Sequence, residues 1–158
     1  MSGQTIATRL LLGLASLACI LQAVAQTGDV AVVVSPDNSI ASVSSIELRK
    51  ILAGEKHSWP NGRPIRIVVR ATGCNERLVL LKLLHMSEAD YKTYWAAQVF
   101  RGETDAEPVI VLSVGMQKEA LQVFPDAVTL VDVHDVKPGM KVLKVDGHLP
   151  GDAGYPVH

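Results

Sequence analysis

The feature that most constrains the fold of this chain is the stretch of residues 65–84, which predicts a buried strand, a turn and a helix. Residues 65–69 form a short, mostly β-branched apolar run, and Gly73 marks a turn soon after it. From Asn75 onward the sequence is leucine-rich over a helical length, with Asn75 as the expected N-cap residue. A glycine turn that opens a helix leaves backbone N–H groups unpaired at the positive end of the helix dipole. Because Arg70 comes just before that turn, this stretch has the groups that a small oxyanion site requires.

The N-terminal residues 1–25 are expected to be a signal peptide rather than part of the fold. Arg9 supplies the positive charge, residues 10–21 form an apolar run, and residues 23–25 (Ala-Val-Ala) are a small-x-small cleavage site. The apolar run is too short to span a bilayer comfortably, and no later run reaches the length of a membrane span. We therefore expect no stable membrane insertion after the signal is cleaved.

Cleavage after Ala25 would leave residues 26–158, enough for one domain with a real hydrophobic core. Lipidation of Cys19 is the alternative, although Ser16 stands where such a site usually has a leucine-like residue. We expect a periplasmic or secreted protein. In that protein Cys74 would be the remaining cysteine, so it could not form an internal disulfide.

The charge pattern argues against several classes of partner. Lys and Arg number 15 against 16 Asp and Glu, and no basic run is interleaved with aromatic residues. Nucleic acid and anionic membranes are therefore poor partners. The five histidines lie far apart, with no pair at metal-ligand spacing, so we expect no metal site and no other cofactor.

The remaining segments predict an alternation of strands and helices. Residues 30–34 (VAVVV) read as a central strand, and residues 108–112, 127–133 and 141–145 as further extended segments. Capping signals predict that helices begin at three serines and carry apolar faces; these are Ser44 (with Glu47, and with Leu48, Ile51 and Leu52 on the face), Ser87 (with Asp90, and with Tyr91, Tyr94, Trp95 and Val99) and Ser113 (with Met116, Ala120, Leu121 and Phe124). A Gly/Pro-rich tail from about residue 146 has no periodic core. This order predicts an α/β fold with a mixed or mostly parallel sheet covered by helices.

Several of these segments resemble a series found in phosphate ABC transporter substrate-binding proteins. The resemblance rests on their order and spacing, in residues 32–38 (VVVSPDN), 44–54 (SSIELRKILAG), 59–62 (WPNG), 94–95 (YW) with 100–102 (FRG), 144–147 (KVDG) and 154–156 (GYP). It covers nearly all of residues 26–158. It implies the type II periplasmic binding protein fold, in which two α/β lobes close on a ligand, with this chain long enough for one lobe.

The chain departs from that family at its expected ligand loop. Residues 70–76 keep the arginine and the first glycine of the family's loop. Cys74 replaces a hydroxyl donor, and Glu76 places a negative charge where the last hydroxyl would lie. A later glycine-containing motif of the family reads PDAVTL here, at residues 125–130.

The function expected from these observations is binding of phosphate or a similar small oxyanion without chemistry. The expected ligand residues are Arg70, Thr72, Gly73, Cys74 and Asn75, joined by Ser35 and Asn38 at the end of the first strand. One alternative is a ligand-free interaction module, an orphan lobe that works with an envelope protein partner or as a homodimer. A more remote alternative is a thiol-dependent enzyme that uses Cys74, whose pKa a helix N-terminus and nearby arginines would lower.

Overall fold

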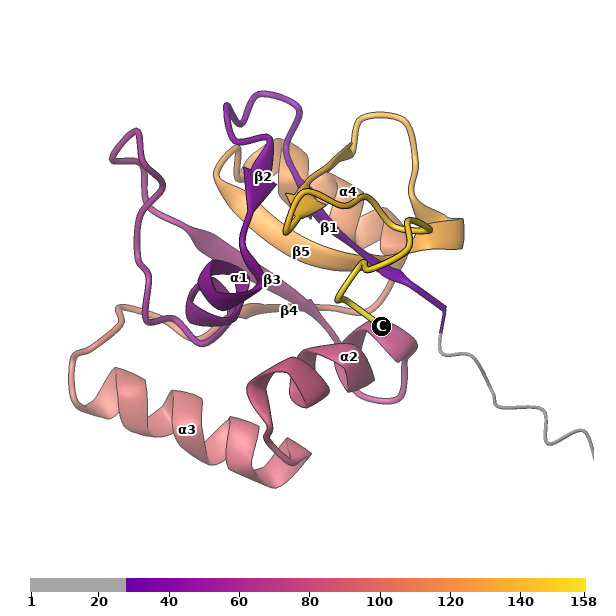
Figure 1. Ribbon diagram of the computed structural model, residues 1–158. Coiled ribbons are helices and arrows are strands. Elements are labelled where there is room, and N and C mark those ends of the chain that lie inside the picture. The colour runs from indigo at the N-terminus through magenta and orange to yellow at the C-terminus, as the bar shows by residue number, and fades with distance from the viewer. Residues whose placement is uncertain (1–27) are drawn as a thin grey trace, which may run out of the picture.

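The computed structural model describes residues 28–158, and its centre is a five-stranded sheet in the order β4-β3-β5-β1-β6 (Figure 1). The strands of this sheet are β1 (Val30–Val34), β3 (Arg66–Arg70), β4 (Val109–Val111), β5 (Ala127–Asp132) and β6 (Lys141–Val142). A separate two-stranded sheet pairs β2 (Ser42–Val43) with β7 (Lys144–Val145). The helices of the described residues are α1 (Ser45–Leu52), α2 (Asn75–Leu84), α3 (Glu88–Phe100), α4 (Val114–Val123) and a 3-10 turn, η1 (Val133–Asp135).

The strands of the larger sheet do not all run the same way. β3 is parallel to both β4 and β5, whereas β1 is antiparallel to β5 and to β6. The carboxyl ends of β3, β4 and β5 therefore meet at one edge, and β1 begins there instead of ending there. The predicted α/β fold with a mixed, helix-covered sheet is confirmed.

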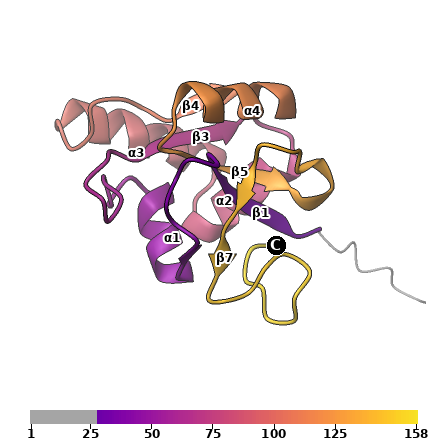
Figure 2. The same cartoon turned by 90° about the horizontal axis from the view of Figure 1, so that it is seen from above.

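Helices cover both faces of the sheet, and each face has its own core (Figure 2). Helices α1 and α2 pack on one face, where Leu48, Leu80 and Val69 belong to the larger cluster. Helix α4 covers the other face, where Leu121 meets Val68 and Val131. Because side chains alternate along a strand, successive residues of β3 contribute to opposite cores.

The helices begin where the serine signals predict. The hydroxyl oxygens of Ser44, Ser87 and Ser113 each accept a backbone N–H from three residues ahead, at 3.1 Å. Only Ser87 has the reciprocal bond, from its own N–H to the Asp90 carboxylate at 3.2 Å. The Glu47 carboxylate instead pairs with Lys56.

Two further expectations about the helices are wrong. Cys74, not Asn75, is the N-cap residue of α2, because Asn75 already has helical geometry. In α4, Met116 is exposed and Gln117 is fully buried in its place. Gln117 is tolerated there because its amide donates to Thr129 Oγ1 at 2.9 Å and to the Leu130 carbonyl at 2.6 Å.

The end of the chain is more ordered than its Gly/Pro-rich sequence indicates. The expected strand 141–145 is divided between the two sheets as β6 and β7, on either side of the buried Leu143. Beyond residue 146, Tyr155 donates from its hydroxyl to the Val30 carbonyl at 2.8 Å, and Val157 is fully buried. The tail thus closes the core beside the start of β1.

Helix α3 is held to the rest of the fold mainly by side chains. Arg77 of α2 makes two hydrogen bonds to the Glu88 carboxylate, at 2.6 and 3.0 Å, and its guanidinium lies 4.1 Å from the centre of the Tyr91 ring. Tyr94 donates to the Ala53 carbonyl at 2.8 Å. Trp95 is buried against Gly54, the residue that follows α1 and its cap.

The predicted signal peptide over residues 1–25, with Cys19, lies outside the described residues. Within residues 28–158, no helix is both long enough and apolar enough to cross a membrane.

Gly54 should be the least replaceable glycine for stability. It has φ +70°, and a Cβ there would overlap the Trp95 ring. We expect Gly54→Ala to lower the free energy of unfolding by about 2–4 kcal/mol, from left-handed backbone strain plus overpacking. Urea unfolding followed by tryptophan fluorescence would measure this loss.

The matched control is Gly62→Ala. Gly62 has φ +82° but open space around a Cβ, so its replacement should cost only the backbone strain, about 1–2 kcal/mol. Equal losses for the two variants would contradict the proposed Trp95 contact.

Candidate functional site

The candidate site lies where β3 and β4 end and the helices α2 and α4 begin. The Ala71 N–H donates to the Val111 carbonyl at 3.0 Å, so the two strand ends stay paired up to the loops. Each loop then leads into a helix: Cys74 is the N-cap residue of α2, and Ser113 is the N-cap residue of α4. Parallel neighbouring strands thus place two helix N-termini, both positive ends of dipoles, at the same edge of the sheet.

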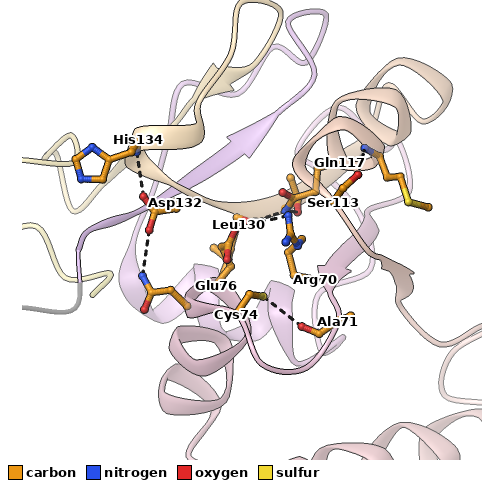
Figure 3. A network of polar contacts seen from close by, with 12 residues as sticks. Arg70, Ala71, Cys74, Glu76, Ser113, Gln117, Leu130, Asp132 and His134 are labelled. Atoms are coloured by element: carbon orange, nitrogen blue, oxygen red, sulfur yellow. Dashed lines mark hydrogen bonds and ion pairs between the residues drawn. The ribbon is translucent and has the colours of Figure 1, made fainter.

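Arg70 points into the space between these helix starts. It shares a face of β3 with Val68, and Figure 3 shows its side chain extending toward the start of α4, with Glu76 and Cys74 nearby. The side chain is only 15% exposed. Its Nε and Nη1 atoms are buried and have no hydrogen-bond partner among residues 28–158.

The buried Glu76 carboxylate is the counter-charge of this arginine. Its Oε1 lies 4.0 Å from Arg70 Nη1, the limit of an ion pair and too long for a hydrogen bond. The pairing of Arg70 with Glu76 is therefore present but incomplete. A buried guanidinium with two unused donors still has capacity for an acceptor.

The turn before α2 supplies backbone donors. Gly73 has φ +91° and is exposed, as is Thr72. The first N–H of this helix to reach the Cys74 carbonyl is that of Leu78, at 3.2 Å. The earlier N–H groups of the turn are the ones that an anion at a helix start can accept from.

Asn75 is placed at this edge, but its side chain has another role. Its Nδ2 lies 3.3 Å from the Gly28 carbonyl and 3.4 Å from Asp132 Oδ2. The other oxygen of Asp132 accepts the His134 backbone N–H at 3.0 Å (Figure 3). Asn75 thus ties the start of α2 to the end of β5 and offers the site its backbone N–H.

Cys74 does not have the environment of a reactive thiol. Its Sγ donates to the Ala71 carbonyl at 3.2 Å. Burial raises the pKa of the Cys74 thiol; the Arg77 backbone N–H lowers it, and the Glu76 carboxylate raises it again. The net shift is upward, so the expectation of a lowered pKa is wrong. Burial and a neighbouring negative charge outweigh the helix N-terminus and the arginines.

Ser35 and Asn38 lie at the opposite edge of the sheet, so the expectation that they approach Arg70 is wrong. Because β1 is antiparallel to β5, Val34 aligns with Val128, near the start of β5. Asn38 Oδ1 accepts the Ile40 N–H at 3.0 Å, which closes a local turn. The amide of Asn38 has a buried Nδ2 without a partner in the described part of the chain, but it is far in register from the Arg70 edge.

Ser113 is a site residue that the sequence does not assign to the ligand, and Gln117 follows it one turn along α4. Ser113 is exposed, and its Oγ already accepts the Met116 N–H, so its hydroxyl hydrogen is available to donate. Gln117 Oε1 is buried without a partner in residues 28–158. The signal for Ser113 was present, because a helix cap after a strand parallel to β3 must fall at the same edge as Arg70.

No group of three or more His, Cys, Asp or Glu side chains that could hold a metal ion occurs within residues 28–158.

Comparison with known proteins identifies the fold. An ABC-type phosphate transport receptor from Vibrio cholerae superposes with a TM-score of 0.61 at 17% identity, covering 77% of this chain and 48% of that one. A candidate phosphate ABC transporter substrate-binding protein from Clostridium perfringens, solved with bound phosphate, gives 0.61 at 17% identity, covering 77% and 46%. PstS from Borrelia burgdorferi gives 0.57 at 19% identity, covering 77% and 49%.

These matches confirm the resemblance to phosphate ABC transporter substrate-binding proteins at the level of the fold. The chain spans about half the length of the solved structures that it matches. No protein-family model and no curated protein sequence matches it. At these identities the likeness establishes the fold alone, an α/β fold like that of about half of each matched protein.

The raised pKa of Cys74 should be visible in its alkylation. We expect the iodoacetamide rate of a Cys19→Ala variant to reach half its maximum at a higher pH than that of a free cysteine peptide. A raised pKa keeps the thiol protonated, so alkylation near neutral pH should be correspondingly slow. Glu76→Gln should move the midpoint downward. A midpoint at or below that of the peptide would restore the thiol-enzyme alternative.

Proposed function

We propose that this protein binds a phosphate-like oxyanion, without covalent chemistry, at the edge where β3 and β4 end. The observation that carries the proposal is Arg70, whose Nε and Nη1 are buried without partners within the described residues. Burying a charged donor without an acceptor is costly, so an arrangement that does so is suited to a ligand that supplies the acceptors.

The other groups at this edge match such a ligand. The backbone N–H groups of the α2 start and the Ser113 hydroxyl are uncharged donors, and they lie at the same edge of the sheet as the arginine (Figure 3). An oxyanion has enough oxygen atoms to accept from a guanidinium and from two helix starts together. Thr72 and Gly73 are exposed, so the ligand could enter from solvent.

The Glu76 carboxylate should make the site prefer phosphate to sulfate. Its carboxylate, 4.0 Å from Arg70, can only accept hydrogen bonds when ionised. Monohydrogen phosphate carries a proton that it can donate to this oxygen, whereas sulfate at neutral pH carries none. A carboxylate beside the cation would therefore repel sulfate and accept phosphate, a repulsive element that sets specificity.

The structural setting supports a role as a solute-binding protein of the cell envelope. The C. perfringens protein with this fold was solved with bound phosphate, and the sequence predicts export through residues 1–25. Because the chain spans about half of the proteins that it matches, a second lobe would have to come from elsewhere or be dispensed with.

The interaction module remains a second candidate function because of the exposed apolar surface around β4. This strand is at the end of the larger sheet, and Ile110 and Leu112 are 58% and 72% exposed. On the adjoining α4, Met116 and Val123 are also exposed. An edge strand with apolar neighbours can pair with another chain. A strict monomer by light scattering, with no partner recovered by crosslinking in the cell envelope, would argue against this role.

Titration calorimetry with phosphate tests the main proposal. We expect the wild-type protein to bind phosphate, and Arg70→Ala to weaken the affinity by about tenfold or more through loss of charged hydrogen bonds. Arg66→Ala is the matched control, because Arg66 lies on the same face of β3 at its other end, over the Phe124 ring. It should bind within about twofold of wild type, since it is remote from the site.

Selectivity gives the second part of this test. Glu76→Gln keeps the size of the side chain and removes its charge, so sulfate binding should strengthen and the preference for phosphate should fall. Neither heat nor a thermal shift from phosphate or sulfate with the wild-type protein would exclude the proposed function.

A further inference from the structure

A cavity lies beneath helix α3, on the opposite face of the sheet from the Arg70 side chain. Its volume is about 220 Å³, and it is bounded by the end of β3, the start of β4, and helices α2 and α3. Val69, Tyr91, Trp95 and Pro108 give it largely apolar walls. A volume several times the roughly 30 Å³ that one water molecule occupies in the liquid is room for a small organic molecule.

Three polar atoms of the lining residues are buried without hydrogen-bond partners in the chain from residue 28 onward. They are Arg77 Nη1, Tyr91 Oη and Trp95 Nε1. The three residues are only 4%, 4% and 2% exposed. Arg77 Nη1 and Trp95 Nε1 can only donate, and the Tyr91 hydroxyl can donate or accept, so a ligand with acceptor oxygens would satisfy all three.

These donors are fixed in place. Arg77 is held by its two bonds to Glu88 and by the Tyr91 ring, which leaves Nη1 as the unused nitrogen. The Tyr91 and Trp95 rings pack edge to face, with their centres 6.2 Å apart. Burial raises the pKa of Tyr91 to about 12, so its hydroxyl remains a donor at any physiological pH. Rigid donors lose little entropy when a ligand binds.

The charges around the cavity do not oppose a singly charged anion. The Arg70 side chain extends from the other face of β3, and on this face Arg77 and Lys92 balance Glu88 and Glu107. Lys92, Glu107 and Ile110 are exposed, so the rim is open to solvent.

We propose that this cavity binds a small monocarboxylate with an apolar body, whose carboxylate accepts from Arg77, Tyr91 and Trp95 and whose apolar part packs against Val69 and Pro108. Residues 70–72 border both sites, but this cavity takes its donors from Arg77, Tyr91 and Trp95, on the face of β3 opposite the Arg70 side chain. A tetrahedral oxyanion has no apolar part to contact the apolar walls of this cavity, so it would be a poorer ligand here than a carboxylate with an apolar body.

The two indole N–H signals of the ¹⁵N-labelled protein provide the test. Trp95 Nε1 has no partner in residues 28–158, whereas Trp59 Nε1 donates to the Asp126 carbonyl at 3.0 Å and lies outside the cavity. Titration with benzoate, phenylacetate and isovalerate should shift the Trp95 signal in a saturable way with at least one of them. The Trp59 signal should stay in place, and benzyl alcohol should produce a smaller shift than benzoate.

Two variants assign the response to the cavity. Tyr91→Phe removes one donor and keeps the ring, and it should weaken binding of the responding carboxylate about tenfold. Tyr94→Phe is the matched control on the same helix, because its hydroxyl is bonded to Ala53 rather than aimed into this cavity, and it should bind like wild type. The proposal is overturned if no carboxylate shifts the Trp95 signal, if both indoles shift together, or if Tyr91→Phe binds as tightly as wild type.

Discussion

The pairing of β5 is the constraint on which the rest of the structure depends. This strand is parallel to β3 on one side and antiparallel to β1 on the other. On the parallel side β5 continues the direction of β3 and β4, whose own parallel pairing brings two helix N-termini together beside Arg70. Because β1 is antiparallel to β5, the loop after β1 lies at the opposite edge and the residues before Val30 lie at the Arg70 edge. There the Asn75 side chain donates to the Gly28 carbonyl.

The electrostatics of the edge where β3 ends depend on Arg70, whose charge is only partly compensated by other residues of the chain. Glu76 is close enough to compensate the charge and too far to hydrogen bond, at 4.0 Å. Arg77 shows the contrasting case of an arginine whose charge is paired within the chain, through two hydrogen bonds to the Glu88 carboxylate that leave only Nη1 without a partner in residues 28–158. The described residues thus contain one guanidinium that is bonded directly to a carboxylate and holds α3 in place, and one whose Nε and Nη1 are both left for another acceptor.

The features that could be predicted from sequence are those that depend on neighbouring residues. Serine caps, the VAVVV strand and the glycine turn before α2 are local, and the structure confirms them. The direction of β1 is set by pairing with residues about a hundred positions later, so Ser35 and Asn38 were placed at the wrong edge. Gln117 was missed because a polar residue is expected to face solvent unless its distant partners, Thr129 and Leu130, are known. The pKa of Cys74 likewise depends on burial, which the sequence does not show.

The strand order also has a kinetic consequence. Within the described residues, β1 pairs with β5 and β6, and the Val30 N–H donates to the Val157 carbonyl. The first of these strands therefore cannot pair until the last third of the chain has been made. Closing such long loops before any contact forms slows folding. Until then this uncharged Val-rich segment, the kind of sequence that self-associates, has no native strand partner. Holding residues 30–34 away from other chains during synthesis is therefore a requirement that this topology imposes on whatever cell makes it.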